Sequence, residues 1–223
     1  MKAQDLSSYI DHTLLKPEAS PDQIIRLCQE ARHYHFASCC VNSSYAALVH
    51  RELAGSGVKT CCVVGFPLGA MSTASKVFEA IDAIHQGAEE IDMVINIGWL
   101  KSGHDKEVLK DIRSVRQGCG EKAILKVILE CCLLTREEII RACKLAVEGG
   151  ADFVKTSTGF STGGATVEDV RLMKETVGNL AQVKASGGIH TKEEALAMIE
   201  AGASRLGASA GVQIVRDNTE AEP

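Results

Sequence analysis

Short apolar runs alternate with longer amphipathic segments along almost the whole chain. The short runs are rich in β-branched residues, as buried strands are, whereas the longer segments repeat apolar residues every three or four positions, as helices do. The pattern predicts eight strands, at residues 9–15, 36–41, 58–64, 90–97, 123–130, 151–155, 181–186 and 205–207. After a short N-terminal helix, further helices are expected at residues 20–35, 44–54, 73–86, 105–116, 135–148, 167–176 and 192–200.

Strands that alternate with helices form βα units, which predict a parallel sheet with right-handed crossovers. Glycine recurs just before several strands, at Gly57, Gly87, Gly150 and Gly202, where it can end the preceding helix in the left-handed conformation. Eight such units within 223 residues fit a compact α/β fold, the (β/α)8 TIM barrel. A doubly wound open sheet is the structural alternative.

The chain contains no linker, low-complexity tract or shift in composition that would mark a domain boundary. We therefore expect a single TIM-barrel domain over residues 1–223, whose polar last ~8 residues form a mobile tail. The net charge of −5 argues against broad nucleic-acid binding. No apolar run reaches the ~20 residues of a membrane span, and the N-terminus lacks the apolar core of a signal peptide. A cytoplasmic protein is expected.

Nine cysteines raise the question of disulfides or a metal site. Six of them form three adjacent pairs, Cys39-Cys40, Cys61-Cys62 and Cys131-Cys132. Neighbours on a strand point to opposite faces, so such a pair cannot offer both sulfurs to one metal. With no Cys-x-x-Cys spacing and seven scattered histidines, we expect free, buried thiols in a reducing compartment and no bound metal. Cys40 stands apart because it lies near a strand end.

Three lysines interrupt apolar strands, Lys126, Lys155 and Lys184. Lysine is rarely fully buried unless something pairs with it, and catalytic groups of a TIM barrel lie at the carboxyl ends of its strands. We expect the three amines to meet the carboxylate of Asp92 at the mouth of the barrel. A purely structural ion network is the alternative interpretation.

Side chains two or four positions apart on a strand share one face, so the faces that carry Asp92 and Lys126 each include a further polar residue. Asn96 is expected beside Asp92 on the fourth strand, and Glu130 beside Lys126 on the fifth. If these faces point inward, the barrel mouth holds several amines and carboxylates.

Lysine chemistry at such a site depends on an amine that has lost its proton, which a neighbouring cation promotes. Lys184 supplies a like charge beside Lys155, so Lys155 is the candidate nucleophile. A neutral amine attacks a carbonyl to form an iminium, which stabilises a carbanion on the adjacent carbon, and Asp92 could move protons. This is carbon–carbon lyase chemistry that needs no metal or organic cofactor.

Two small-residue loops predict a phosphate site. They are Gly187-Gly188 after the seventh strand and Gly207-Ala208-Ser209 after the eighth. Loops at these two places, together with a short extra helix, often bind phosphate in this fold, because glycine lets backbone N–H groups approach the oxygens.

Long motifs at these residues resemble one enzyme family. They are Asp-His-Thr-Leu-Leu-Lys-Pro (11–17), Cys-Val-Asn (40–42), Val-Gly-Phe-Pro-Leu-Gly (64–69), Glu-Ile-Asp-Met-Val-Ile-Asn-Ile-Gly (90–98), Leu-Lys-Val-Ile-Leu-Glu (125–130), Phe-Val-Lys-Thr-Ser-Thr-Gly-Phe (153–160), Lys-Ala-Ser-Gly-Gly-Ile (184–189) and Leu-Gly-Ala-Ser-Ala-Gly (206–211). Together they cover nearly the whole chain and closely resemble the deoxyribose-phosphate aldolases, class I aldolases on a TIM barrel.

The resemblance implies a role for each matching residue. Lys155 matches the Schiff-base lysine, Asp92 a proton-relay aspartate, Lys184 a tuning or relay lysine, and Lys126 a supporting lysine. The phosphate loops match those of the family, with Gly159 beside them, and Thr13 matches a position next to the substrate. Two positions depart from many members, His190 and Phe160, where a cation is common.

The resemblance also implies an activity. It is the reversible cleavage of 2-deoxy-D-ribose 5-phosphate to D-glyceraldehyde 3-phosphate and acetaldehyde, without a cofactor, in a homo-oligomer such as a dimer or tetramer. Three alternatives remain at this point. They are another Schiff-base aldolase acting on a different phosphorylated sugar, an isomerase or cyclase with a phosphate site, and a non-catalytic sugar-phosphate binder.

Overall fold

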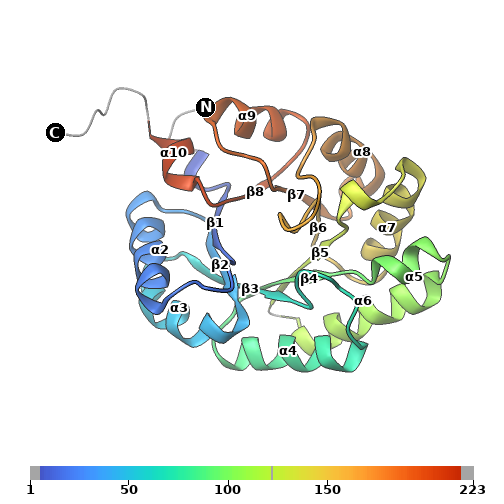
Figure 1. Ribbon diagram of the computed structural model, residues 1–223, viewed down its shortest axis with the longest axis horizontal. Coiled ribbons are helices and arrows are strands. Elements are labelled where there is room, and N and C mark those ends of the chain that lie inside the picture. The colour runs from blue at the N-terminus through green and yellow to red at the C-terminus, as the bar shows by residue number, and fades with distance from the viewer. Residues whose placement is uncertain (1–5, 122, 217–223) are drawn as a thin grey trace.

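The eight strands expected from the sequence close into a barrel in the computed structural model, which describes residues 6–121 and 123–216. They are β1 (Ile10–Leu14), β2 (Ser38–Asn42), β3 (Lys59–Val64), β4 (Glu90–Val94), β5 (Ile124–Ile128), β6 (Phe153–Lys155), β7 (Gln182–Ser186) and β8 (Arg205–Ala208). Every strand is parallel to the next, and β8 pairs with β1. Figure 1 shows the strands as an inner ring with helices outside. The predicted (β/α)8 TIM barrel is confirmed, and the open-sheet alternative is wrong.

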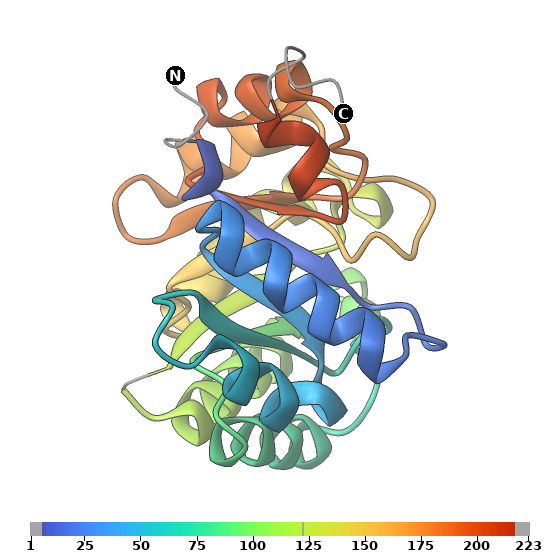
Figure 2. The ribbon, with the colours of Figure 1, turned by 90° about the vertical axis from the view of Figure 1, so that its left-hand side faces the viewer.

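All seven helices expected between the strands are present. They are α2 (Pro21–Tyr34), α3 (Ala46–Leu53), α4 (Thr73–His85), α6 (Asp105–Cys119), α7 (Arg136–Glu148), α8 (Val167–Val177) and α9 (Lys192–Glu200). Figure 2 shows α2 crossing the outside of the barrel, where it contacts β1 and β2. Of the short N-terminal helix, the described part is residues 6 and 7, which are helical. The expected mobile tail lies almost wholly outside the described residues.

Four short elements were not predicted as separate helices with their own bounds. They are η1 (Ser43–Tyr45), α5 (Ile97–Lys101), η2 (Cys131–Leu133) and α10 (Gly211–Val215). Each is three to five residues long, too short to show a helical repeat in a hydrophobic pattern.

Two expected strand residues lie beyond the ends of their strands. β4 ends at Val94, and the Asn96 side chain accepts a hydrogen bond from the Trp99 N–H as the N-cap of α5, so Asn96 does not extend the face of Asp92. β5 ends at Ile128, and Glu130 adopts the left-handed conformation with φ 59°. The alternation rule failed in both cases because side-chain hydrogen bonds redirect the backbone after the strand.

Helix ends follow the local signals in the sequence. Ser20 caps α2 through a capping box with Gln23, and Pro21 occupies the first turn. Gly87 and Gly202 have φ of 102° and 115° just before β4 and the approach to β8, as expected for residues that end a helix. At Gly87 a Cβ atom would also collide with the His50 side chain.

Adjacent cysteines point to opposite faces of the barrel wall. Cys39 and Cys62 join the main apolar core between strands and helices. Cys40 and Cys61 instead form a small inner cluster with Leu15 and Val63. Within residues 6–121 and 123–216, no helix combines the length and the apolar character needed to cross a bilayer.

Candidate active site

Buried ion pairs fill the interior of the barrel. The side chains that they connect, among the described residues, are Asp11 of β1, Glu90 and Asp92 of β4, Lys126 of β5, Lys155 of β6, Lys184 of β7 and Arg205 of β8. These contacts join strands on opposite sides of the barrel, so the side chains point inward. The amines and the aspartate that the sequence predicted to meet do so.

Asp92 is the centre of this network. Its Oδ2 accepts hydrogen bonds from Lys155 Nζ and Lys184 Nζ, both at 2.8 Å, and its Oδ1 accepts one from Lys126 Nζ at 2.8 Å. Burial alone would raise the pKa of Asp92, but the three ammonium groups outweigh it and hold that pKa well below its usual range. Asp92 is therefore a carboxylate at neutral pH.

Lys126 and Lys184 each have two carboxylates within 3 Å, and Lys126 Nζ also lies 3.9 Å from Asp11. Lys126 Nζ lies 2.5 Å from Glu90 and 2.8 Å from Asp92, and Lys184 Nζ lies 2.5 Å from Asp11 and 2.8 Å from Asp92. Burial alone would lower the pKa of both lysines, but the carboxylates outweigh it and raise both values above the ordinary range. Both side chains therefore carry a positive charge.

Lys155 differs from the other two amines in two ways. Within the described part of the chain it contacts one carboxylate, Asp92, and it lines a cavity at the barrel mouth. Lys126 and Lys184 are not among the residues that line that cavity and are fully buried. Lys155 is thus the amine that a bound molecule would reach first.

The charges inside the barrel do not balance. Three carboxylates of Asp11, Glu90 and Asp92 face four basic groups. Among the three lysines, Lys155 makes the fewest contacts with the described carboxylates, because its Nζ pairs with Asp92 alone.

The cavity above Lys155 has a volume of about 480 Å³. Its walls are residues 13–16 at the end of β1, 158–160 after β6, 186–190 at and after the end of β7, and 207–209 at and just after the end of β8. Gly207 and Ala208, predicted to lie in a loop, are thus the last residues of β8. The predicted residues that line it are Thr13, Gly159, Gly187, Gly188, Gly207, Ala208 and Ser209. Phe160 and His190, where the resemblance implied a departure from many family members, line it as well.

The loops after β6 and β7 touch through their backbones. The Ala165 N–H donates to the Gly187 carbonyl oxygen at 3.0 Å, and a Cβ atom on Gly164 would lie 2.3 Å from that oxygen. Gly187 and Gly188 have φ of 83° and 75°, a region that other residues rarely adopt. The cavity wall at this point is therefore built from main chain.

Glu130 holds the loop that follows Lys155. Its carboxylate accepts hydrogen bonds from the Thr158 N–H at 3.1 Å and from the Thr158 hydroxyl. Glu130 is 2% exposed and leaves its strand in a left-handed conformation to make these contacts. It acts on the cavity wall through Thr158 and does not extend the face of Lys126.

Comparison with known proteins identifies the family of this fold and site. A family model described as DeoC/LacD family aldolase matches residues 6–220. The chain belongs to the DeoC/LacD aldolase family. Members of such a family are lyases that break and form carbon–carbon bonds.

Relatives in this aldolase family extend over the whole chain. A deoxyribose-phosphate aldolase of Clostridium novyi is 59% identical over 98% of both chains, and one of Finegoldia magna is 62% identical over 95% of this chain and 99% of its own. Among solved structures, the tetrameric deoxyribose phosphate aldolase of Aeropyrum pernix is 33% identical with a TM-score of 0.89, covering 96% of this chain and 91% of its own.

Sequence reasoning missed three members of the ion-pair network inside the barrel, Asp11, Glu90 and Arg205. Arg205 Nη1 lies 2.7 Å from Asp11 and 3.1 Å from Glu90 and links the first and last strands to the centre of the barrel. All three are charged residues within predicted strands, the signal that singled out the lysines. They were passed over because they lie near the amino ends of β4 and β8 or in the short first strand.

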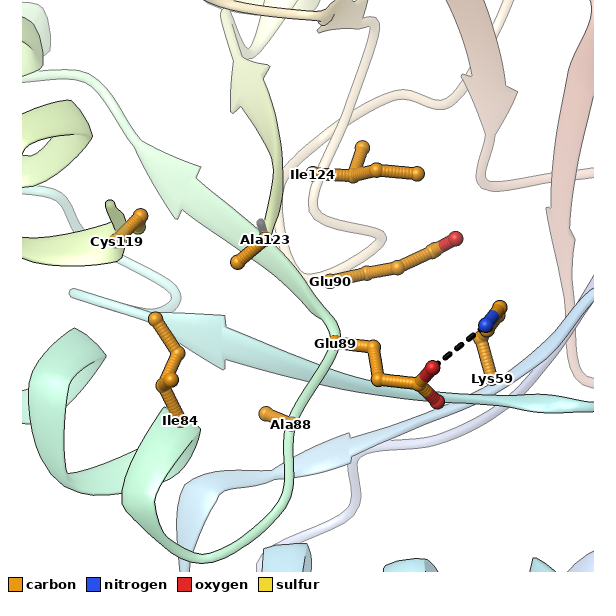
Figure 3. A pocket seen from close by; sticks show the side chains of 8 residues that line it. All are labelled: Lys59, Ile84, Ala88, Glu89, Glu90, Cys119, Ala123 and Ile124. Carbon is orange, nitrogen blue, oxygen red and sulfur yellow. Dashed lines mark hydrogen bonds and ion pairs between the residues drawn. The ribbon is translucent and has the colours of Figure 1, made fainter. Parts of the chain in front are cut away.

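Glu90 also reaches a second cavity, at the amino ends of β3, β4 and β5. Figure 3 shows this cavity, of about 300 Å³, with Glu90 beside the ion pair of Lys59 and Glu89, whose charged atoms lie 2.6 Å apart. In TIM barrels this end serves stability, whereas the carboxyl ends carry catalysis. The chemistry is therefore assigned to the cavity above Lys155.

The depressed pKa values of the inner carboxylates predict acid sensitivity. Burial alone would raise the pKa of Asp11, but Lys184, Lys126 and Arg205 outweigh it and lower that pKa, as the lysines do for Asp92. The stability that these two carboxylates contribute is fully present above their unfolded pKa of ~3.9. It is lost as the pH falls toward their lower pKa values in the folded protein.

We therefore expect the urea midpoint to fall steeply below about pH 4. Asp11→Asn should be less stable at pH 7 and should lose less stability on acidification. If the urea midpoints of the wild type and of Asp11→Asn fell equally steeply with decreasing pH, the low pKa of Asp11 would not be a source of the acid sensitivity.

Proposed function

We propose that this chain cleaves 2-deoxy-D-ribose 5-phosphate reversibly to D-glyceraldehyde 3-phosphate and acetaldehyde through a Schiff base on Lys155. The observation that carries this proposal is the position of Lys155. It is the amine at the floor of the mouth cavity, it contacts one carboxylate, and it belongs to a network with one basic group in excess. The names of the relatives in Clostridium novyi and Finegoldia magna support the choice of substrate.

Lys155 reacts as the neutral amine. Its loss of a proton removes the excess positive charge of the network, while Lys126 and Lys184 keep Asp92 ionised. The amine attacks C1 of the open-chain sugar, and water leaves as the Asp92–Lys184 pair supplies one proton, which gives the iminium. The C3 hydroxyl then returns a proton to that pair, the electrons of the C2–C3 bond move toward the iminium nitrogen, and glyceraldehyde 3-phosphate departs.

The remaining enamine takes a proton at C2 and is hydrolysed, which frees acetaldehyde and restores the amine. Asp92 and Lys184 are the proposed proton carriers, because they are hydrogen-bonded to each other and Asp92 also accepts a hydrogen bond from Lys155. The pKa of Asp92 is held too low for it to keep a proton, so we expect the pair to pass protons onward. Lys126 supports the pair by holding Asp92 Oδ1.

The loops that line the cavity are proposed to anchor the phosphate. Gly187, Gly188 and residues 207–209 lie on the same wall, with Gly159 nearby. Thr13 lines the same cavity and is proposed to lie near the sugar. Its hydroxyl donates a hydrogen bond to the Asp11 carbonyl oxygen. Anchoring the phosphate fixes C1 in register with Lys155, which is a gain in orientation.

An assay of purified protein with 2-deoxy-D-ribose 5-phosphate tests this function directly. We expect glyceraldehyde 3-phosphate and acetaldehyde to appear in equal amounts, and the reverse reaction to proceed when both are supplied. The family model also covers LacD aldolases, so a panel of phosphorylated ketoses should be assayed beside the deoxy sugar. A higher kcat/KM for one of those sugars would favour the alternative of a different Schiff-base aldolase.

The phosphate anchor makes a separate prediction. Unphosphorylated 2-deoxy-D-ribose should react with kcat/KM lower by about 10²-fold or more. Gly188→Ala should raise KM for the phosphorylated sugar about tenfold, because a Cβ at φ 75° costs ~1–2 kcal/mol and displaces the loop. Gly178→Ala is the matched control, since Gly178 has φ 55° and lies outside the cavity lining. Equal KM values for Gly188→Ala and Gly178→Ala would contradict the proposal that the loop of Gly188 anchors the phosphate.

The oligomeric state proposed for this chain is taken from a related enzyme. The Aeropyrum pernix enzyme is tetrameric, and we expect a homo-oligomer here, either a dimer or a tetramer. Light scattering coupled to size exclusion would measure the mass against the 23.8 kDa chain.

A further inference from the structure

Two thiols of the inner cluster lie against the catalytic carboxylate. Cys40 and Cys61 are register partners on β2 and β3, and their sulfurs are 3.7 Å apart. Cys61 Sγ lies 3.3 Å from Asp92 Oδ1, and all three ligand atoms lie within 4.8 Å of one another. Each of the three residues is fully buried. The adjacent cysteines considered in the sequence cannot share a metal, but these two come from different strands.

Two of the separations among these three atoms are close to those of ligands on one tetrahedral metal ion. With metal–sulfur bonds of ~2.3 Å and metal–oxygen bonds of ~2.1 Å, two bound sulfurs lie ~3.8 Å apart and a sulfur and an oxygen ~3.6 Å apart. The observed separations are 3.7 Å and 3.3 Å. A cation bound by these three atoms has a fourth position left for water.

A bound cation has to displace the Lys126 ammonium, whose Nζ lies 3.4 Å from Cys61 Sγ and 2.8 Å from Asp92 Oδ1. Binding replaces the two thiol protons with one divalent ion, so two protons are released, no electron is transferred and the local charge is unchanged. The neighbouring Cys61 thiol lowers the pKa of Cys40, which favours the thiolate form of that residue. Burial raises the pKa of the Cys61 thiol, so the second proton is the costlier one to release.

We propose that Cys40, Cys61 and Asp92 form a binding site for a thiophilic divalent cation such as Zn²⁺ or Cd²⁺, and that occupancy inhibits the enzyme. Two thiolates select soft or borderline ions, whereas Mg²⁺ and Ca²⁺ prefer all-oxygen sites. Inhibition, which rests on the proposed function, follows because the cation takes Asp92 Oδ1 from Lys126 and pulls the carboxylate away from Lys155 and Lys184.

The route of entry predicts slow binding. The cluster has no exposed atoms of its own residues, and Lys155 connects it to the mouth cavity through Asp92. Leu15, which lines the mouth cavity, also packs in the inner cluster. A cation must pass between buried side chains to reach the thiols, so inhibition should develop with time after mixing.

Cobalt gives the sharpest test, because a thiolate bound to Co²⁺ produces a charge-transfer band in the near ultraviolet. We expect one Co²⁺ per chain, a band with the intensity of two thiolates, and displacement of Co²⁺ by Zn²⁺ but not by excess Mg²⁺. Equilibrium dialysis with Zn²⁺ should give the same stoichiometry. A wild-type protein without the thiolate band would overturn the proposal without any variant.

Variants locate the site, and the chain supplies its own controls. Cys40→Ser and Cys61→Ser should weaken Zn²⁺ binding about 100-fold or more and abolish the band. Cys39→Ser and Cys62→Ser remove the outward-facing neighbours on the same strands and should retain it. Melting temperatures would show that each variant is folded.

Two outcomes would overturn the site. One is a band that survives in Cys40→Ser and Cys61→Ser, and the other is a band that disappears in Cys39→Ser or Cys62→Ser. Metal binding is measured without substrate, so its failure would leave the aldolase function untouched. Binding at this site without loss of aldolase activity would overturn the inhibitory role alone.

Discussion

Replacing Lys155 with methionine is expected to lower kcat by at least about 10⁴-fold while leaving the free energy of unfolding within about 1.5 kcal/mol of the wild type. The loss of activity follows because methionine cannot form an imine. The stability is kept because the substitution removes the basic group that the network holds in excess, and Asp92 retains Lys126 and Lys184.

The neighbouring lysines provide the matched controls. Lys126→Met and Lys184→Met each leave two carboxylates short of a partner, and should cost ~3–5 kcal/mol. Urea unfolding of the three variants at pH 7, with kinetics on the folded fraction, would make the comparison. If Lys155→Met were as unstable as Lys184→Met, Lys155 would be a structural member of the network. If it stayed active, Lys155 would not be the nucleophile.

Replacing Asp92 with asparagine is expected to harm both stability and turnover. The carboxylate neutralises three ammonium groups in a fully buried site, so its loss should destabilise the fold by ~3–5 kcal/mol. Turnover should fall by about 10²–10⁴-fold, the usual contribution of a proton-transfer group.

A second substitution separates these two effects. In the double variant Asp92→Asn with Lys126→Met, one cation leaves together with the anion, so stability should recover in part. Turnover should not recover, because Lys155 and Lys184 still lack their shared carboxylate. Recovery of both quantities together would mean that Asp92 acts only by holding the barrel together.

The sequence was sufficient to predict the barrel and the centre of its site, for a local reason. Lys126, Lys155 and Lys184 each break an apolar strand, and parallel strands place such residues side by side whatever the details of their loops. The register confirms this, because Asp92 is the strand partner of Lys126 and Lys155 the partner of Lys184.

The rest of the network depends on contacts that no local pattern contains. Asp11 and Arg205 are 194 positions apart and meet only because β8 closes on β1. Cys40 and Cys61 meet because two strands pair with one particular register. Periodicity shows which face a residue occupies but not which residue lies across the barrel.

Strand ends were the other limit of prediction. Asn96 and Glu130 continue the alternation of their strands in sequence, yet their side chains bind nearby backbone N–H groups and end the strand early. A short polar side chain such as that of Asn96 competes with strand hydrogen bonds through local contacts of this kind. For Glu130 the partner is Thr158, on the next strand's loop.

The central claim is that catalysis proceeds through a covalent imine on Lys155, and reductive trapping tests it most directly. Protein mixed with 2-deoxy-D-ribose 5-phosphate or acetaldehyde and treated with borohydride should lose activity and gain one substrate-derived mass per chain. Peptide mapping should place that mass on Lys155. An active enzyme that acquires no adduct, or carries it on Lys126, Lys184 or a surface lysine, would contradict the account.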